Sequence, residues 1–381
     1  YESTNRILIV YPSTVPSVKP SVARQVGMCT GANDIILVSA SHVMTHYTSG
    51  QDASIAASTW PDANRYYLFD PSVTPMELGV TYSGTLGTMG VWSSYTSCGC
   101  NEPGEDQVFS FTAPFTGSYT FTATGTFGDP DFFLMSSFGN SGTNIGSGCW
   151  GQGTKTLSLA SGTTYYIIAD NYSSSETAGY SVSVQVAPAT IPYTCSFDTD
   201  SESIPWTFVN SSYTNYWTIG TATSTSASKS LYITNDDGSS NAYTTTYSSY
   251  VYAYRKLNFT SAGNYVVSFK WKARGEGGCW DAMYAALVPS GTACPPASNI
   301  TGNTNSLPSG YINVADVSQS YNTTGAFLWT NDDSGWKISS KTINISAAGE
   351  YTLVFYWKND GGGGTNPPAA VDDIEVSTPC T

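Results

Sequence analysis

The sequence is poor in charge, and its few charges are mostly negative. Only 11% of the 381 residues are charged, and 14 lysines and arginines stand against 28 aspartates and glutamates, which gives a net charge of −14. Binding to nucleic acid depends on clustered Lys and Arg side chains that neutralise phosphates. The composition therefore argues against nucleic acid as a partner, and it disfavours anionic membrane surfaces for the same reason.

Long hydrophobic runs and helical patterns are also missing. No apolar run approaches the roughly 20 residues of a membrane-spanning helix, so we expect no membrane insertion. Ser, Thr, Asn, Gly and Tyr replace the usual charged residues, and they suit strands and turns better than helices. The chain is nevertheless 40% hydrophobic and 14% aromatic, which is enough to bury real cores and excludes wholesale disorder.

Histidine is nearly absent, which limits the catalytic and metal sites that the chain could build. The two histidines, His42 and His46, have the spacing of a helical zinc pair, but the Glu of the H-E-x-x-H motif is missing and the surroundings are not helical. A Ser-His-Asp triad would have to use one of them, and no G-x-S-x-G elbow flanks any serine. Nothing marks a carboxylate pair for glycoside hydrolysis. We therefore predict a protein without catalytic activity.

Cysteine is present in an even number, eight, and is spread along the chain, which favours disulfides in an oxidising compartment. The only close pair has the spacing C-x-C, which is too short for a C-x₂-C half of a zinc site. The expected bridges are Cys195–Cys380, Cys279–Cys294 and Cys149 with Cys98 or Cys100, while Cys29 takes the cysteine left over. Such bridges predict an extracellular or outer-surface protein.

Turn residues and prolines divide the chain into three segments, 1–80, 81–188 and 193–381. The first holds two apolar runs, at 7–11 and 35–38, and is expected to be irregular and β-rich. The second is a series of short strands separated by turn signals, which predicts a β-sandwich. The stretch 187–192, with two prolines, is expected to be a linker. The predicted fold class is all-β, with tandem β-sandwich or jelly-roll domains.

The third segment contains an internal repeat. Residues 257–272 and 343–358 share a pattern of a short strand, a turn at Ala-Gly and a long strand. We interpret each copy as a hairpin whose long strand places alternate residues on one face. Two such hairpins favour a jelly-roll-like double sheet with one hairpin in each half. The residues expected on the two faces are Tyr265, Val267, Phe269 and Trp271, and Tyr351, Leu353, Phe355 and Trp357.

Motifs of the third segment resemble those of choice-of-anchor J and cleaved-adhesin domains, which are related to MAM-type jelly rolls. The matching residues are Cys195–Asp198 with Trp206, Trp280–Ser290, Ala348–Asp360 and Pro367–Ile374. The resemblance covers about half of the chain. It implies a bacterial surface or secreted protein that is adhesive or ligand-binding, often with structural Ca²⁺.

The second segment resembles a bacterial pre-peptidase C-terminal domain. The residues that carry this resemblance are Glu105–Phe111, Gly128–Leu134 and Thr164–Ala169. Domains of this kind accompany secreted peptidases and carry no catalysis themselves. The resemblance therefore implies an accessory role for this segment.

A calcium site is expected near the two ends of the third segment. Asp372 shares a strand face with two apolar residues that should point inward, and a buried carboxylate needs a cation or several donors. A Cys195–Cys380 bridge would bring Asp198 near Asp372, and Asp200 offers a further oxygen. Given the family resemblance, we expect a structural Ca²⁺ held by Asp198, Asp200 and Asp372. The alternative is that Asp198 lies in a solvated turn and Asp372 accepts backbone hydrogen bonds.

Other loops rich in Asn, Asp and Gly are interpreted as turns. Residues 235–238, 331–335 and 359–361 look like ligand runs for Ca²⁺, but none fits the twelve-residue EF-hand loop. Asn, Asp and Gly are also the residues that tight turns require. We extend the same interpretation to Asp129 and Asp131.

Aromatic residues indicate how a ligand would be held. Most of the 27 tyrosines and 10 tryptophans have the spacing of core residues, whereas Trp280, Trp329 and Trp336 lie near loops. These three are the better candidates for ligand contact, with core packing as the alternative for each. We predict a non-catalytic, adhesin-like protein that binds a glycan or a protein outside the cell. The alternatives are an accessory or targeting part of a secreted peptidase and a structural spacer on the cell surface.

Overall fold

The computed structural model divides the chain into two compact units, residues 1–186 and 187–381. It describes residues 73–88, 92, 95, 98–139, 143, 145, 150–277, 280–299, 306–320, 326–330 and 335–379, and the backbone of 35–38 and 44–47. In these ranges the regular structure is strand except for the short helix α3 (Asp200–Ser203) and the 3₁₀ turn η2 (Val317–Gln319). None of the described helices is long and apolar enough to cross a membrane. The predicted all-β fold class is confirmed.

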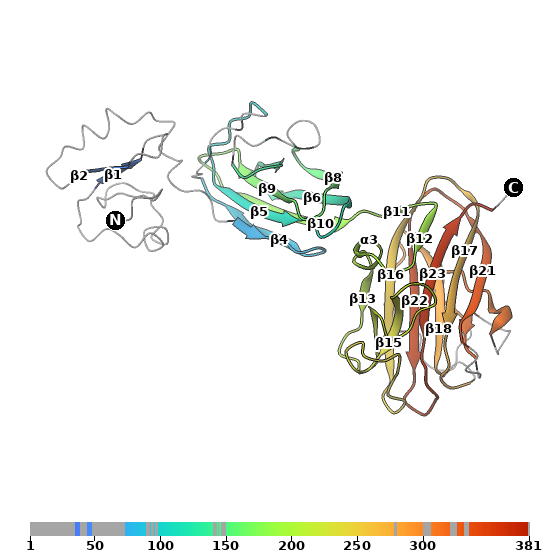
Figure 1. Ribbon diagram of the computed structural model, residues 1–381. Helices are drawn as coiled ribbons and strands as arrows, with labels where there is room; N and C mark the ends of the chain where they lie inside the picture. Colours follow the sequence, from blue (N-terminus) through green and yellow to red (C-terminus); the bar gives the residue numbers. More distant parts are fainter. Residues whose placement is uncertain are drawn as a thin grey trace. The chain divides into compact units, whose positions relative to one another are not determined.

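The first unit is a sandwich of two four-stranded sheets (Figure 1). One sheet has the order β3 (Val73–Pro75), β5 (Asp106–Thr112), β9 (Thr164–Asn171), β7 (Pro130–Met135). The other has the order β4 (Thr81–Leu86), β10 (Ala178–Val186), β6 (Gly117–Phe127), β8 (Gly153–Leu159). Alternate residues of β5 and β6 face inward, so that Phe109, Phe111, Tyr119 and Phe121 build the core between the sheets. Since β3 belongs to this sandwich, it begins by residue 73 rather than at the expected residue 81.

The N-terminal segment contributes one described hairpin. Strand β1 (Ile35–Val38) pairs antiparallel with β2 (Met44–Tyr47), which confirms the strand expected over 35–38. The run at 7–11 lies outside the described residues.

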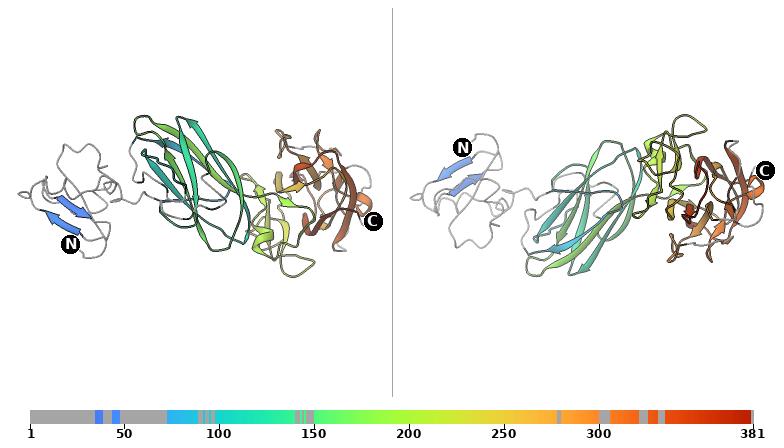
Figure 2. Two further views of the ribbon diagram at one scale, coloured as in Figure 1. Left: turned by 90° about the horizontal axis from the view of Figure 1, so that it is seen from above. Right: turned by 90° about the horizontal axis from the view of Figure 1, so that it is seen from below.

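The second unit is also a sandwich, and its core runs between a seven-stranded and a six-stranded sheet (Figures 1 and 2). The first sheet holds β11 (Ala189–Thr190), β16 (Ser249–Phe259), β22 (Gly349–Asn359), β18 (Ala282–Pro289), β19 (Ile312–Asn313), β13 (Thr207–Val209) and β20 (Phe327–Leu328). The second sheet holds β14 (Tyr216–Gly220), β15 (Ser230–Thr234), β23 (Ala370–Ser377), β17 (Gly263–Lys272), β21 (Lys337–Ile345) and β12 (Tyr193–Cys195).

The expected linker at 187–192 is part of this second sandwich. Strand β11 pairs in parallel with β16, and the Arg255 guanidinium donates a hydrogen bond of 2.9 Å to the Ala187 carbonyl. The residues that follow Val186 are therefore held by the second unit rather than left free.

The two repeat copies are not hairpins, and this prediction was wrong. In the first copy β16 pairs with β22 and β17 pairs with β21, so the turn at 260–262 carries the chain from one sheet to the other. The second copy crosses in the opposite direction, from β21 to β22. Gly263 and Gly349 begin the long strands with φ of 143° and 141°, a conformation open to glycine. Each copy therefore gives one strand to each sheet.

The faces predicted for the long strands are confirmed. Tyr265, Val267, Phe269 and Trp271 of β17 are buried in the same core as Tyr351, Leu353, Phe355 and Trp357 of β22. The rings of Phe269 and Phe355 meet edge to face across the sandwich, with centroids 5.1 Å apart. Period-two alternation identified which side chains turn inward, because that feature is local to each strand.

The cysteines differ from the expected pairing. Cys98 is disulfide-bonded, whereas Cys195 and Cys294 are free thiols, which contradicts both the Cys195–Cys380 and the Cys279–Cys294 bridge. Strand β12 places Cys195 opposite Ile374 of β23, which ends at Ser377. Burial raises the pKa of both free thiols to about 11. The remaining members of the expected bridges, Cys29, Cys149, Cys279 and Cys380, lie outside the described residues.

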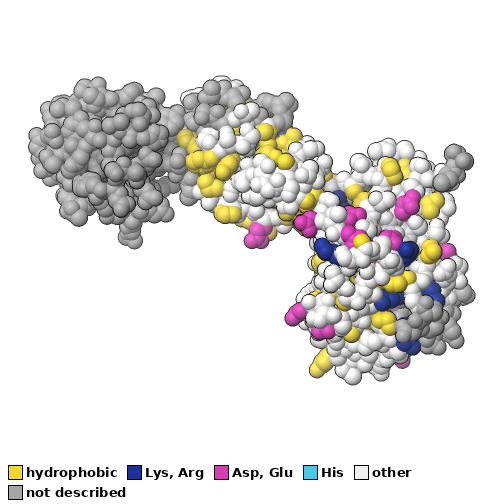
Figure 3. Space-filling model, in the orientation of Figure 1, with side chains coloured by type: hydrophobic (Ala, Val, Ile, Leu, Met, Phe, Trp, Pro, Cys, Tyr) yellow, Lys and Arg dark blue, Asp and Glu magenta, His cyan; other side chains and the backbone are white. Residues whose placement is uncertain are grey.

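The surface reflects the low charge of the sequence. On the face drawn in Figure 3, uncharged polar groups and backbone cover most of the described area, with acidic and basic side chains scattered between them. Two ion pairs are present among the described residues, Lys256 with Glu350 and Lys270 with Asp373. Burial of aromatic and aliphatic side chains between sheets is therefore the main stabilising contribution.

Candidate functional site

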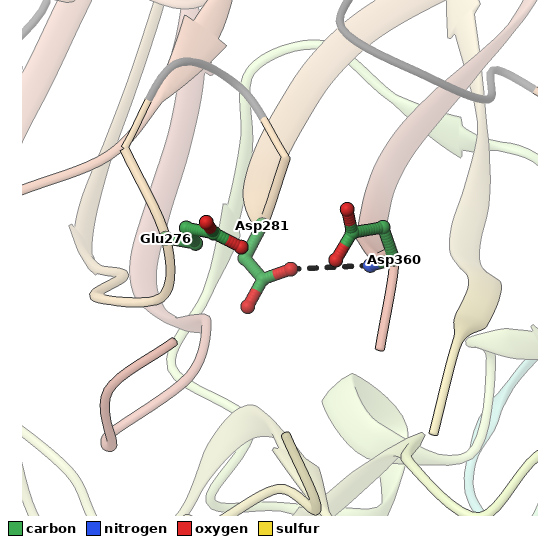
Figure 4. A group of neighbouring side chains, drawn as sticks. All are labelled: Glu276, Asp281 and Asp360. Atoms are coloured by element: carbon green, nitrogen blue, oxygen red, sulfur yellow. Dashed lines mark hydrogen bonds between the residues drawn. The ribbon is translucent and has the colours of Figure 1, made fainter. Parts of the chain in front are cut away.

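Three acidic side chains meet at one end of the second sandwich (Figure 4). Glu276 lies in the loop between β17 and β18, Asp281 directly precedes β18, and Asp360 directly follows β22. Because β18 and β22 are antiparallel neighbours with Ala282 opposite Lys358, the start of one strand and the end of the other share an edge. One carboxylate oxygen from each side chain lies within 4.8 Å of the other two. We call these three residues the Asp281 group.

Asp281 is the buried centre of this group, with an exposed fraction of 0%. Its Oδ2 accepts a hydrogen bond of 2.6 Å from the Tyr243 hydroxyl, and its Oδ1 accepts one of 3.2 Å from the Asp360 backbone N–H. Burial raises the pKa of Asp281 to about 6, although the Tyr243 hydroxyl and the Asp360 N–H oppose the rise. The carboxylate is therefore charged at neutral pH but close to its titration.

Glycines allow the loops to close tightly around Asp281. A Cβ at Gly275 would lie 2.6 Å from the Cβ of Asp281, and a Cβ at Gly364 would overlap the Tyr243 hydroxyl and an Asp281 oxygen. Both glycines have positive φ, 127° and 112°. The Thr365 N–H donates to the Gly275 carbonyl at 3.0 Å and ties the two loops together.

Two exposed aromatic residues lie in chain segments that adjoin the Asp281 group. Trp280 adjoins Asp281 in sequence and is 37% exposed, which is unusual for an indole. Tyr247 is 60% exposed, and its loop packs against Gly361, where a Cβ would lie 3.2 Å from the Tyr247 carbonyl carbon. The Asn359 side chain also donates to the Tyr247 carbonyl. Exposed aromatic residues and carboxylates therefore come from neighbouring chain segments at this end of the unit.

The structure places the other two predicted tryptophans close to the same loops. Trp329 is buried, and its ring packs against Gly277, at 3.1 Å from the position of an added Cβ. This burial agrees with the core-packing alternative for Trp329. Trp336 is half-buried, with the Lys272 ammonium 5.3 Å from its ring centroid, a cation–π arrangement. Of the three predicted residues, Trp280 is the most accessible to a ligand.

The residues predicted to hold calcium lie elsewhere in the second unit. Asp198 accepts hydrogen bonds from the backbone N–H groups of Ser228 and Lys229 at 2.9 and 2.8 Å, which lower its pKa. Asp372 is buried and accepts from the Thr225 N–H at 2.7 Å and the Asp373 N–H at 2.8 Å. The loop at 225–229 therefore joins these two carboxylates.

Asp200 is not part of this arrangement. It is exposed at the start of α3, whose N-terminus is closed by a capping box between Thr199 and Glu202. Both oxygens of Asp372 have donors, as the alternative of backbone hydrogen bonds required. Burial raises the pKa of Asp372, and the hydrogen bonds from Thr225 and Asp373 oppose that rise.

Neither histidine contributes a described side chain. His42 lies outside the described residues, and for His46 the structure describes only the backbone within β2.

Sequence reasoning missed the Asp281 group. The loop at 359–361 was interpreted as a turn, and Glu276 and Asp281 were not singled out, although both adjoin glycine-rich loops. The signal available in the sequence was that one aspartate directly precedes an apolar strand and another aspartate directly follows a second apolar strand. Only the pairing of β18 with β22, which no local pattern specifies, shows that the two meet.

The carboxylates and rings of this site suit two kinds of chemistry. Carboxylate oxygens accept hydrogen bonds from hydroxyl groups and are the ligands that hard cations such as Ca²⁺ prefer. Aromatic faces stack on flat apolar surfaces, and an aromatic ring that is partly exposed keeps that surface available. The arrangement is therefore suited to a polar ligand that also has an apolar face.

Comparison with known proteins leaves the family open. No family model matches the chain, and no curated protein matches it. Among solved structures, the tandem pair of CBM22 modules from Paenibacillus barcinonensis is 13% identical, covers 79% of this chain and 92% of its own, and has a TM-score of 0.30. The K1 cleaved adhesin domain of Lys-gingipain from Porphyromonas gingivalis is 15% identical, covers 49% and 98%, and has a TM-score of 0.27.

A catalytic protein is also similar. The enzymatically active domain of tailspike protein 4 from bacteriophage CBA120 is 10% identical, covers 48% of this chain and 20% of its own, and has a TM-score of 0.26. The similar structures thus include binding modules, an adhesin domain and an enzymatic domain. At these scores we base the function on the residues of this chain alone, and the resemblance to pre-peptidase C-terminal domains stays a prediction.

Proposed function

We propose that this chain is an extracellular, non-catalytic binding protein whose second unit recognises a glycan at the loops around the Asp281 group. The observation that carries the proposal is that the exposed residues Trp280 and Tyr247 lie in chain segments next to the acidic group, since Trp280 directly precedes Asp281 and the Tyr247 backbone packs on Gly361. A sugar ring offers an apolar face for stacking and hydroxyl groups for hydrogen bonds. Rings and carboxylates side by side complement both features.

The burial of Asp281 keeps this carboxyl group from direct contact with a ligand. Glycoside hydrolysis requires two carboxyl groups that both reach the scissile bond. Asp281 has no exposed surface, and its two oxygens accept hydrogen bonds from Tyr243 and Asp360. In the proposed role Asp281 braces the loops, while Glu276 and Asp360 face the ligand.

Extracellular location is supported by the cysteine content. Eight cysteines are present in a chain with only two histidines, and Cys98 is disulfide-bonded. Disulfides persist in oxidising compartments and are rare in the cytosol. The low charge and polar, uncharged surface suit a protein that works outside the cell.

Calcium is the proposed structural cofactor of the second unit. The support is that Asp198 and Asp372 hold the same loop, 225–229, from two sides. A Ca²⁺ ion at this place would join the start of the unit to β23 and would use carboxylate and loop carbonyl oxygens. Asp200, on the exposed first turn of α3, is the weakest of the three proposed ligands.

Glycan binding can be tested with the full chain on an array of polysaccharides, followed by calorimetry with the best ligand. We expect Trp280→Ala and Tyr247→Ala each to weaken binding by at least about tenfold, because stacking aromatics dominate such contacts. Tyr172→Ala is the matched control, since Tyr172 is 57% exposed but belongs to the first unit. Binding that survives both substitutions in the second unit would refute the site.

The same experiment separates the alternatives. A protein ligand would show binding to host or matrix proteins that is lost in Trp280→Ala while the glycan array stays blank. An accessory role for a peptidase would show binding to a peptidase, and a structural spacer would bind none of these.

A further inference from the structure

The loop at 243–247, which leads into β16, carries two tyrosines with different surroundings. Tyr243 begins the loop, and its hydroxyl donates a hydrogen bond of 2.6 Å to Asp281. Tyr247 ends the loop and is 60% exposed. One short segment therefore connects the buried centre of the Asp281 group to an aromatic residue that is open to a ligand.

Asparagine side chains hold this loop, which lies outside the strands. The Thr244 N–H donates to Oδ1 of Asn215 at 2.7 Å, and Nδ2 of Asn215 donates to the Thr244 carbonyl at 3.1 Å. The Tyr247 carbonyl accepts from Nδ2 of Asn215 at 3.2 Å and from Nδ2 of Asn359 at 2.5 Å. Side-chain amides thus supply the partners that the backbone of a strand or helix would find in its own ladder.

The two asparagines also bind each other across the sandwich. Asn215 directly precedes β14 of the six-stranded sheet, and Asn359 ends β22 of the seven-stranded sheet. Nδ2 of Asn215 donates to Oδ1 of Asn359 at 3.1 Å. Both side chains are fully buried, with exposed fractions of 0%. Burying an amide is costly unless its polar atoms are hydrogen-bonded, and the bonds described here run to the partner asparagine and to the loop.

The chain after Asn359 packs directly against the same loop. Gly361 has a φ of 83°, and a Cβ at this position would lie 2.9 Å from the Ser248 nitrogen and 3.3 Å from the Thr246 carbonyl oxygen. Only a glycine allows the two backbones to approach so closely. The loop is therefore fixed to the segment that also carries Asp360 of the Asp281 group.

Hydrogen bonds from the two amides determine the orientation of the loop as well as its position. An apolar pair of similar size would fill the same space, and such replacements are often nearly neutral for stability. Apolar side chains would not fix the direction of the Thr244 N–H or of the Tyr247 carbonyl. The amides do fix these directions, and with them the backbone from which the Tyr247 side chain projects.

We propose that Asn215 and Asn359 are positioning residues that order the loop at 243–247 and so present Tyr247 to the glycan, an inference that rests on the proposed function. A residue that is held in place before the ligand arrives loses less conformational entropy on binding. The two asparagines thus contribute to affinity without touching the ligand.

Hydrogen exchange on the full chain without ligand measures the order of the loop. Asn215→Ala and Asn359→Ala should each speed exchange in peptides that cover residues 243–248 by about tenfold or more, because the loop then opens more often. Asn344→Ala is the control: Asn344 donates to Asn264 at 3.0 Å in another asparagine pair, between β17 and β21. This variant should leave exchange at 243–248 unchanged.

Calorimetry with the best glycan then tests whether the order of the loop serves binding. Asn359→Ala should weaken binding by about three- to tenfold in the wild-type chain. The same substitution should leave the affinity of a Tyr247→Ala chain unchanged, since Asn359 acts through Tyr247. Equal weakening in both chains, or unchanged binding in a variant whose loop exchanges faster, would overturn the proposal.

Thermal melts show whether each variant is folded at the assay temperature, and if one asparagine variant does not fold, the other carries the test. A wild-type chain that binds no glycan would contradict the proposed function. Exchange at 243–248 still decides whether the asparagines order the loop in that case, and rates that stay unchanged in both variants would overturn the inference.

Discussion

Replacing Tyr243 with phenylalanine tests whether Asp281 carries a buried charge that affects the stability of the second unit at the loops around the Asp281 group. Phenylalanine keeps the ring that packs edge to face on Trp357 at 5.5 Å and removes only the hydroxyl that donates to Asp281. A hydrogen bond to a buried charged group is worth about 1.5–3 kcal/mol, compared with about 0.5–1.5 kcal/mol for a neutral one. The effect of the substitution should therefore depend on the ionisation of Asp281.

The sign of this dependence follows from the raised pKa. Asp281 titrates at about 6 in the folded chain instead of its ordinary 3.8, so the folded state holds the proton more tightly than the unfolded state. The associated stability is fully present below about pH 4 and is lost as the pH rises through 6, a loss of about 3 kcal/mol. Tyr243→Phe should raise this pKa further. It should destabilise the unit by about 2 kcal/mol at pH 8 and by about 1 kcal/mol or less at pH 5.

Hydrogen exchange in peptides that cover β18 and β22 measures the free energy of opening at the loop end, and calorimetry gives the melting midpoint of the unit. Both are compared at pH 5 and pH 8 in the full chain, with exchange rates corrected for pH. Asp281→Asn is the control, because it removes the titrating group and should flatten the dependence on pH. An equal loss of stability in Tyr243→Phe at both pH values would refute the assignment of Asp281 as the buried charge.

Three further predictions concern the same unit. Gly364→Ala should destabilise the unit by about 2 kcal/mol or more in a thermal melt. Gly291 also has positive φ but is surrounded by open space, so Gly291→Ala should destabilise the unit by only about 1 kcal/mol. Equal losses of stability would contradict the close approach of Gly364 to Asp281. Phe355→Ala should destabilise it by about 3–5 kcal/mol in chemical denaturation, since Phe355 is fully buried between the sheets, and a loss below about 1 kcal/mol would contradict that packing. EDTA should lower the melting midpoint of wild type but not of Asp372→Asn, and an unchanged wild-type midpoint would remove the calcium proposed there.

Local sequence patterns were sufficient to predict the class of the fold and the inward faces of its strands. Tyr265, Val267, Phe269 and Trp271 alternate with polar residues, and alternation is fixed by the backbone of a single strand. The partners of these strands could not be predicted in this way. A turn at Ala-Gly can close a hairpin or carry the chain to the opposite sheet, and the choice depends on contacts roughly 100 residues away.

The same limit explains the candidate sites. Asp360 lies in a loop whose residues are those of any tight turn, and Asp281 becomes notable only once β18 is paired with β22. The contact between Asn215 and Asn359 joins positions 144 residues apart, so no spacing along the chain indicates it. Trp280 could be named as a candidate from the sequence because an indole beside a glycine-rich loop is a local feature.

The position of β23 determines the order in which the second unit can be assembled. This strand, residues 370–377, lies between β15 and β17 in its sheet, yet it is the last described strand to leave the ribosome. Until then β15 and β17 each present an unpaired backbone edge, and such edges are prone to pair with other chains. The two halves of this sheet therefore join only when the last described strand is inserted, and both exposed edges must be shielded from aggregation until then.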